Sequence, residues 1–190
     1  KSVLLLDHAS KPAQKIRISG GGRCNFTNLH IDPSKFISHN PHFCKSALSR
    51  YTQYDFINLV DSYGIKWHEK NPEDGLGQLF CDGSSQEIID MLIAEADKAG
   101  VELRLGEGVN TVTKNAKGFL LGLTEGNVIC TDLIIATGGK SIPKMGATGW
   151  AYDIARQFEL DVVPTQPALV PLTFGGAILD MTKDLKSLTL

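Results

Sequence analysis

Ser2-Val-Leu-Leu-Leu-Asp7 is an apolar run of strand length that ends in a carboxylate. Such runs are typical of strands that are buried on both faces of a parallel sheet. A second run, Leu133-Ile-Ile-Ala-Thr137, leads directly into the pair Gly138-Gly139. We therefore expect both segments to be strands of an open α/β sheet, in which ligands bind at the carboxyl ends of the strands.

Helical patterns lie between these two runs. Apolar residues recur at helical spacing from about 41 to 64 and predict two helices, with Thr52 and Asp55 as an N-terminal capping pair. Ser84 and Glu87 resemble a capping box, and the apolar stripe that follows them predicts the clearest helix of the chain.

The strand patterns between the two apolar runs are shorter. Alternating apolar and charged residues predict a half-exposed strand at 101–105, and three runs between 111 and 131 predict a small antiparallel meander. Residues 67–83 are expected to be irregular apart from a short strand at 79–80, and a further helix is expected at about 150–159.

A glycine-rich segment, Ser19-Gly-Gly-Gly-Arg-Cys-Asn-Phe-Thr-Asn28, predicts a ligand-binding loop. Its three successive glycines, which allow close approach of the backbone and offer free N–H groups, are Gly20, Gly21 and Gly22. Arg23 adds a guanidinium that can form two parallel bonds to phosphate, and Asn25 adds an amide. The combination suits an anionic or heteroaromatic ligand. The alternative is a flexible turn with a surface arginine, and the segment is not a Walker A loop.

Two strand ends are further candidates for ligand contacts. Asp7 resembles the acid that accepts hydrogen bonds from ribose hydroxyls in dinucleotide-binding folds, although the chain contains no GxGxxG turn. The alternative is a carboxylate bonded to local amides. Gly138 and Gly139 would let a ligand approach the carboxyl edge of the sheet, but many βα turns also hold two glycines.

Cysteines and histidines give weaker signals. Cys24 lies beside Arg23, which would favour a thiolate, but no histidine pairs with it by spacing, so a small packed residue is the preferred interpretation. The four cysteines show no zinc spacing and indicate reduced cytosolic thiols. The histidines, which we expect on the surface or in loops and in no metal site, are His8, His30, His39, His42 and His68.

Composition excludes several classes of protein. The chain has 190 residues, 42% of them hydrophobic, and a net charge of −2, which argues against a strongly basic nucleic-acid binder. The longest apolar runs fall well short of the roughly 20 residues that cross a bilayer, so no membrane partner is expected. We expect a cytoplasmic protein that acts on a small-molecule substrate, without nucleic acid. The sequence gives no signal for the oligomeric state.

The segment from Lys15 to Asn28 closely resembles the SGGGRCNxTN signature of a group of bacterial FAD-dependent oxidoreductases, the aminoacetone oxidase-like flavoproteins. Three further segments occur in the order of that family. They are Leu79-Phe-Cys-Asp-Gly-Ser84, Leu133–Ser141 with Gly146–Gly149, and Gln166-Pro-Ala-Leu-Val-Pro-Leu172. The resemblance spans nearly the whole chain.

The resemblance implies a glutathione-reductase-type, Rossmann-like FAD-binding fold with a second domain inserted into it. Asp7 would hold the adenosine ribose, Val109 would pair its backbone with adenine, and the glycine loop would face the pyrophosphate and ribityl chain. The residues implied in cofactor binding are Asp7, Lys15, Gly20, Gly21, Gly22, Arg23, Cys24, Asn25, Val109, Ala136, Thr137, Gly138 and Gly139. The residues show no metal-binding pattern, and none of them is identified as a catalytic acid or base.

Departures from the family pattern suggest a fragment. The family begins with a strand and a GxGxxG turn that are not found here, and prolines at 164, 167 and 171 place a boundary near Pro171. We expect residues 1–171 to be the FAD-binding domain and residues 172–190 to begin the inserted domain. The isolated piece should bind FAD poorly and should lack activity.

The expected function is that of an FAD-dependent oxidoreductase that transfers hydride between NAD(P)H, or a small organic substrate, and an acceptor. One alternative is a non-catalytic module that binds ADP or FAD. A further alternative, an RNA-modifying flavoprotein, would call for a basic surface and is disfavoured by the net charge.

Overall fold

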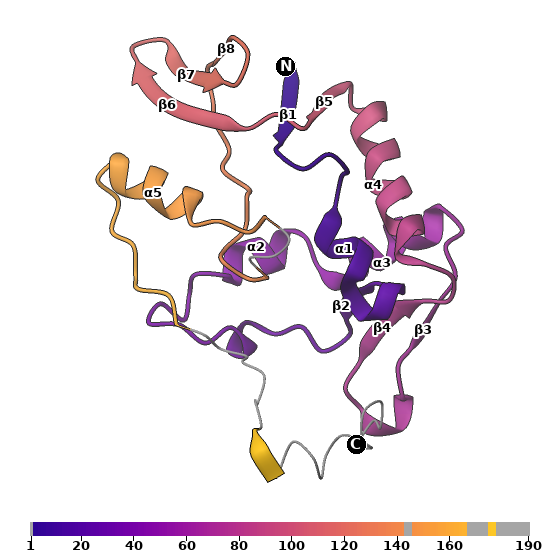
Figure 1. Cartoon of the computed structure of the whole chain (residues 1–190). Coiled ribbons are helices and arrows are strands. Elements are labelled where there is room, and N and C mark those ends of the chain that lie inside the picture. Colours follow the sequence, from indigo (N-terminus) through magenta and orange to yellow (C-terminus); the bar gives the residue numbers. More distant parts are fainter. Residues whose placement is uncertain (1, 143–145, 167–174, 178–190) are drawn as a thin grey trace. The chain divides into compact units, whose positions relative to one another are not determined.

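The computed structural model of the chain describes residues 2–142, 146–166 and 175–177. Residues 1–151 and 152–190 form two compact units. The helices and strands, which Figure 1 colours in chain order, are β1 (Val3–Asp7), α1 (Gln14–Ile18), η1 (Ser19–Gly22), β2 (Asn25–Asn28), η2 (Pro33–Lys35), α2 (Lys45–Arg50), α3 (Gln53–Ser62), β3 (Trp67–Glu69), η3 (Pro72–Asp74), β4 (Gln78–Cys81), α4 (Ser85–Lys98), β5 (Val101–Leu105), β6 (Val109–Asn115), β7 (Gly118–Leu123), β8 (Asn127–Cys130) and α5 (Trp150–Gln157).

The parallel pair of strands is β1 and β5. Val3 lies opposite Val101, and the register continues to Asp7 opposite Leu105. Parallel strands need a crossover connection, and α4 leads directly into β5 to complete it. The predicted α/β class with a Rossmann-like parallel sheet is confirmed, and two antiparallel sheets accompany that sheet.

The predicted helix starts are confirmed in detail. The Thr52 side chain accepts a hydrogen bond from the Asp55 backbone N–H, and the Asp55 carboxylate accepts one from the Thr52 backbone N–H. Ser84 and Glu87 form the same reciprocal capping box at the start of α4. These bonds satisfy backbone donors that a helix cannot satisfy internally, which explains why both helices begin where the sequence predicts.

The second sheet has the strand order β2-β4-β3 and is antiparallel. Its central strand β4 buries Leu79 and Cys81 on one face, where Cys81 joins a core with Val60 of α3 and Ile88 of α4. This sheet corrects two expectations, because the glycine-rich segment ends in strand β2 rather than continuing as a loop, and β3 lies inside a stretch expected to be irregular.

The third sheet is the predicted meander, with the order β6-β7-β8. Val112 of β6 and Leu121 and Leu123 of β7 are buried within it. Short runs of strand-forming residues separated by turn residues such as Lys117-Gly118 and Glu125-Gly126-Asn127 are sufficient to predict such a unit from sequence.

Residues 133–137, expected to form a buried strand, are not in a strand. Ile134 is 87% exposed. An apolar run forms a strand only when a neighbouring strand takes up its backbone hydrogen bonds, and among the described residues β1 has β5 as its only partner. The boundary expected near Pro171 lies outside the described residues.

Candidate functional site

The glycine-rich segment folds into a tight turn that we call the glycine turn, residues 19–24. Gly20 and Gly21 have φ angles of 58° and 65°, in the left-handed region that favours glycine. Gly20 packs against the ring of Phe80, so closely that a Cβ atom could not be accommodated there. Gly21 and Gly22 face open space, with no atom within 4 Å of an added Cβ. The outer side of the turn is therefore accessible to a ligand.

Arg23 anchors the turn through its backbone and leaves its side chain available. Its carbonyl accepts a hydrogen bond of 2.9 Å from the backbone N–H of Cys81 in β4. The guanidinium is exposed and, within the described part of the chain, forms no hydrogen bond or ion pair. A free guanidinium beside an open glycine turn suits a phosphate group.

Cys24 is packed rather than reactive. The residue is 4% exposed, and burial raises the pKa of its thiol, an effect that the hydrogen bond with Ser19 partly offsets. Because the thiolate is the nucleophilic form, a raised pKa argues against a nucleophilic role. The interpretation of Cys24 as a small packed residue is thus the one that the geometry supports. Its φ angle of 52° is unusual for a residue other than glycine and reflects the sharp turn.

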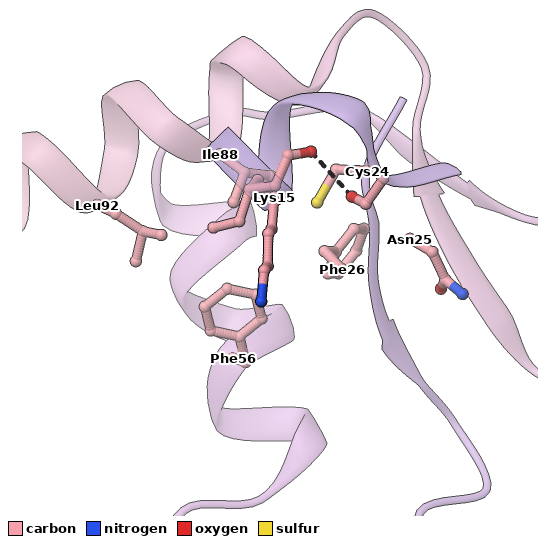
Figure 2. Close-up of a pocket in the computed structure, with 9 residues that line it drawn as sticks. Lys15, Cys24, Asn25, Phe26, Phe56, Ile88 and Leu92 are labelled. Carbon is pink, nitrogen blue, oxygen red and sulfur yellow. Dashed lines mark hydrogen bonds between the residues drawn. The ribbon is translucent and has the colours of Figure 1, made fainter. Parts of the chain in front are cut away.

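A pocket of about 300 Å³ adjoins the turn (Figure 2). Figure 2 shows the Lys15 side chain extending toward Phe56. Cys24 and Phe26 lie beside it, and the Asn25 side chain points away from them. The pocket is lined by Lys15, Ile16, Ser19, Cys24, Asn25, Phe26, Phe56, Ile88 and Leu92. A mainly apolar lining with a few polar groups is typical of cofactor sites.

Lys15 connects helix α1 to the segment after residue 137. Its Nζ donates a hydrogen bond of 3.0 Å to Oγ of Ser141, and it lies 3.7 Å from where a Cβ of Gly138 would be. Gly138 has a φ angle of 71°, so the turn there requires glycine. The structure therefore brings Lys15 and the Gly138-Gly139 turn together, while Ala136 and Thr137 are exposed.

Asp7 and Val109 lie at the end of the parallel sheet. Oδ1 of Asp7 accepts a hydrogen bond of 2.9 Å from the Ala9 backbone, and its main-chain carbonyl accepts one from Glu107. No group of the described residues donates to the other carboxylate oxygen, Oδ2. Val109 begins β6 only two residues after Glu107. Neither Asp7 nor Val109 lines the pocket of Figure 2.

Sequence reasoning missed one pair of side chains. Nδ1 of His68 lies 2.6 Å from Oδ1 of Asp82, and the His68 ring stacks on Phe80. The sequence predicts only that His68 lies on the surface or in a loop. No spacing motif reveals the pair, because the pairing of β3 with β4 brings position 68 opposite position 80.

These residues fit an FAD molecule in their chemistry. An open glycine turn and a free guanidinium can bind phosphate oxygens, and an available carboxylate oxygen at the end of a β-strand can accept hydrogen bonds from ribose hydroxyls. The apolar pocket beside the turn offers contacts to a ring system.

The fold and these features define a Rossmann-type domain for binding a nucleotide cofactor. The match to a known family covers residues 1–189 and carries the description "HI0933-like protein Rossmann domain". The chain belongs to this family, which is one of FAD-binding, oxidoreductase-like flavoproteins. The expected resemblance to FAD-dependent oxidoreductases is confirmed at this level.

The curated proteins that are similar to the chain include three relatives. "Ribosomal RNA dihydrouridine synthase" from Escherichia coli is 53% identical over 95% of the chain and 44% of the relative. The protein of the same name from Haemophilus influenzae is 46% identical over 92% of the chain and 43% of the relative. "3-dehydro-bile acid delta(4,6)-reductase" from Clostridium scindens is 26% identical over 90% of the chain and 41% of the relative. The chain thus spans less than half the length of the curated relatives it matches.

The expectation that no nucleic acid is involved is wrong, because two close relatives are named for a reaction on ribosomal RNA. The physical reason is that net charge is a property of the whole chain. A local group of cations can bind phosphates in a protein whose total charge is −2.

Two kinds of feature are absent from the described residues. No helix in this part of the chain is both long and apolar enough to span a bilayer. Across the same residues, no group of three or more His, Cys, Asp or Glu side chains is placed to hold a metal ion.

Proposed function

We propose that this chain is the FAD-binding part of an enzyme that reduces uracil bases of ribosomal RNA to dihydrouracil. The observation that carries the proposal is the 53% identity to a ribosomal RNA dihydrouridine synthase over 95% of the chain. The open glycine turn supports the flavin part of the proposal, because it offers phosphate contacts beside an apolar pocket.

Reduced FAD, when bound, supplies a hydride for such a reaction. In this proposal different residues of the chain bind different parts of the cofactor. Arg23 and the glycine turn bind the pyrophosphate and ribityl region, and Asp7 holds the adenosine ribose. Lys15 holds the Gly138-Gly139 turn close to the cofactor through its bond to Ser141.

NADH or NADPH is the proposed source of the electrons. We keep residues 1–171 as the FAD-binding domain and residues 172–190 as the start of an inserted domain, both as parts of the proposal. A ribosomal RNA substrate also implies a cytoplasmic location.

The test uses the intact gene product and ribosomal RNA transcribed in vitro, which carries no modified bases. The protein is incubated with this RNA and NADH or NADPH without oxygen, and the digested nucleosides are analysed by mass spectrometry. The proposal expects a uridine product heavier by one molecule of H₂. Flavin that is bleached by NAD(P)H but leaves every uridine unchanged would instead indicate a small-molecule oxidoreductase. Binding of ADP without flavin would indicate the non-catalytic module.

A further inference from the structure

The pair His68–Asp82 lies beside the glycine turn, on the face of the second sheet that also carries Phe80 and Asn25. Oδ1 of Asp82 is 2.6 Å from Nδ1 of His68. The His68 side chain is 45% exposed and the Asp82 side chain is 52% exposed. A carboxylate bound to Nδ1 orients the imidazole and fixes which nitrogen faces outward. Nε2 has no hydrogen-bond partner among the described residues, so it is available to an external molecule.

The pair is connected to the glycine turn through a single aromatic ring. His68 lies directly opposite Phe80 across the β3–β4 ladder, and the two ring centroids are 6.4 Å apart with an interplanar angle of 24°. The edge of Phe80 in turn contacts Gly20. On the other side of β4, Asn25 lies opposite Phe80. Asn25, Phe80 and His68 therefore form one row across three strands.

The charges around this row suit a nucleotide. Nζ of Lys70 lies 5.7 Å from the centroid of the Phe80 ring and can attract a phosphate. The acidic groups nearby are Asp82, which His68 binds, and Glu87, whose carboxylate accepts a hydrogen bond from the Ser84 backbone. Single-stranded RNA bases stack on exposed aromatic and histidine rings, and the outer face of His68 offers such a surface.

We propose that His68, held by Asp82, donates the proton that completes the reduction of the uracil base. This inference rests on the proposed function. Reduction of the C5=C6 bond adds one hydride and one proton. The base accepts the hydride at one carbon, and the electron pair of the double bond forms a new bond from the other carbon to the proton released by Nε2. The base gains two electrons from the hydride donor, and neutral His68 regains its proton from water.

Other acids near the turn are less suitable donors. Cys24 and Cys81 are buried, and burial raises the pKa of both thiols, that of Cys81 to about 12. Lys15 is engaged with Ser141. Histidine is the common general acid at neutral pH, because its unperturbed imidazole changes charge between about pH 5 and 8.

The first test compares His68→Gln and Asp82→Asn with a matched control, His39→Gln, which changes an exposed histidine outside the sheet. The intact protein is reduced without oxygen, and its reoxidation by ribosomal RNA is followed. His68→Gln should slow this step on the order of 100-fold or more. Asp82→Asn should slow the same reoxidation step by a smaller factor. Flavin content and the rate of reduction by NAD(P)H should be unchanged in all variants.

The second test does not depend on turnover. Diethyl pyrocarbonate labels exposed histidines, and the ribosomal RNA should cause loss of labelling at His68 but not at His39, in protein with or without flavin. Equal labelling of His68 with and without RNA would overturn the inference. So would an RNA-active wild type whose His68→Gln variant is reoxidised by ribosomal RNA at the same rate. A wild type that forms no dihydrouridine would overturn the proposed function, and the proton donor with it.

Discussion

Phe80 of β4 closes against Gly20 of the glycine turn so tightly that a Cβ atom on Gly20 would lie 2.6 Å from Cε1 of the ring. The same Cβ would lie 2.8 Å from the backbone nitrogen of Asn25. This contact joins the proposed cofactor turn to the sheet that carries His68 and Asp82. The position of the glycine turn therefore depends on the position of this sheet.

Gly20→Ala should destabilise the protein more than Gly21→Ala. Both substitutions place a Cβ in a left-handed backbone, which costs about 1–2 kcal/mol, but only the first also meets atoms closer than 3.0 Å. Overpacking adds about 1–3 kcal/mol. Thermal unfolding of the intact protein measures the difference. Equal losses at the two positions would show that the contact with Phe80 does not constrain the turn.

Arg23→Ala should weaken FAD binding roughly 10- to 100-fold, because charge-assisted hydrogen bonds contribute about 1.5–3 kcal/mol. The FAD affinity of Arg23→Lys should lie between those of the wild type and Arg23→Ala, since lysine keeps the charge but loses the planar fork of the guanidinium. Titration of flavin-free protein with FAD measures the affinities. Arg50→Ala is the matched control, because Arg50 is also exposed but lies on α2. An affinity in Arg23→Ala equal to that of the control would remove Arg23 from the site.

Asp7→Asn should weaken the binding of FAD and leave the binding of FMN unchanged. Asparagine can still accept the local hydrogen bond from Ala9, so the turn after β1 is retained. It presents an amide donor or a neutral oxygen in place of the carboxylate that would accept from ribose hydroxyls. Because FMN has no adenosine, the ratio of the two affinities isolates this contact. A parallel loss for both flavins would place Asp7 outside the ribose site.

Alkaline pH should destabilise the fold through Cys81. Burial raises the pKa of its thiol from 9.0 to about 12, and the neighbouring Cys24 adds to the effect. The folded protein therefore keeps the thiol protonated where the unfolded chain ionises it. The resulting stabilisation is fully present below about pH 9 and is lost as the pH rises toward 12.

Cys81→Ala provides the test of that linkage. The variant should be less stable than the wild type at pH 7, because it leaves a small cavity in the core. The difference in melting temperature should shrink between pH 9 and pH 11, where only the wild type loses the contribution of the thiol. A difference that stays constant across this range would contradict the assignment.

The parts of the fold that sequence could predict are those set by local interactions. The capping pairs Thr52–Asp55 and Ser84–Glu87 fix two helix starts by bonds across three residues. The meander follows from short strand-forming runs that are separated by turn residues. Strand β3, in contrast, is short and polar, and it exists because β4 supplies its hydrogen bonds. Residues 133–137 show the opposite case, an apolar run that has no partner strand among the described residues.

The site divides in the same way. The glycine turn could be predicted, because three glycines before an arginine have few structural explanations other than close approach of a ligand or chain. Its packing on Phe80 and the pairing of His68 with Asp82 could not, since both depend on the register of an antiparallel sheet. Net charge disfavours an RNA-modifying flavoprotein, although two relatives are named for a reaction on ribosomal RNA, because net charge averages over the whole surface.

The flavin content of the purified intact protein tests the central claim most directly. The protein is denatured, and the released flavin is identified by chromatography and quantified against the protein concentration. The account predicts FAD at close to one molecule per chain in the wild type, and a clear loss in Arg23→Ala. Protein that contains no flavin, and that fails to take up added FAD, would contradict it.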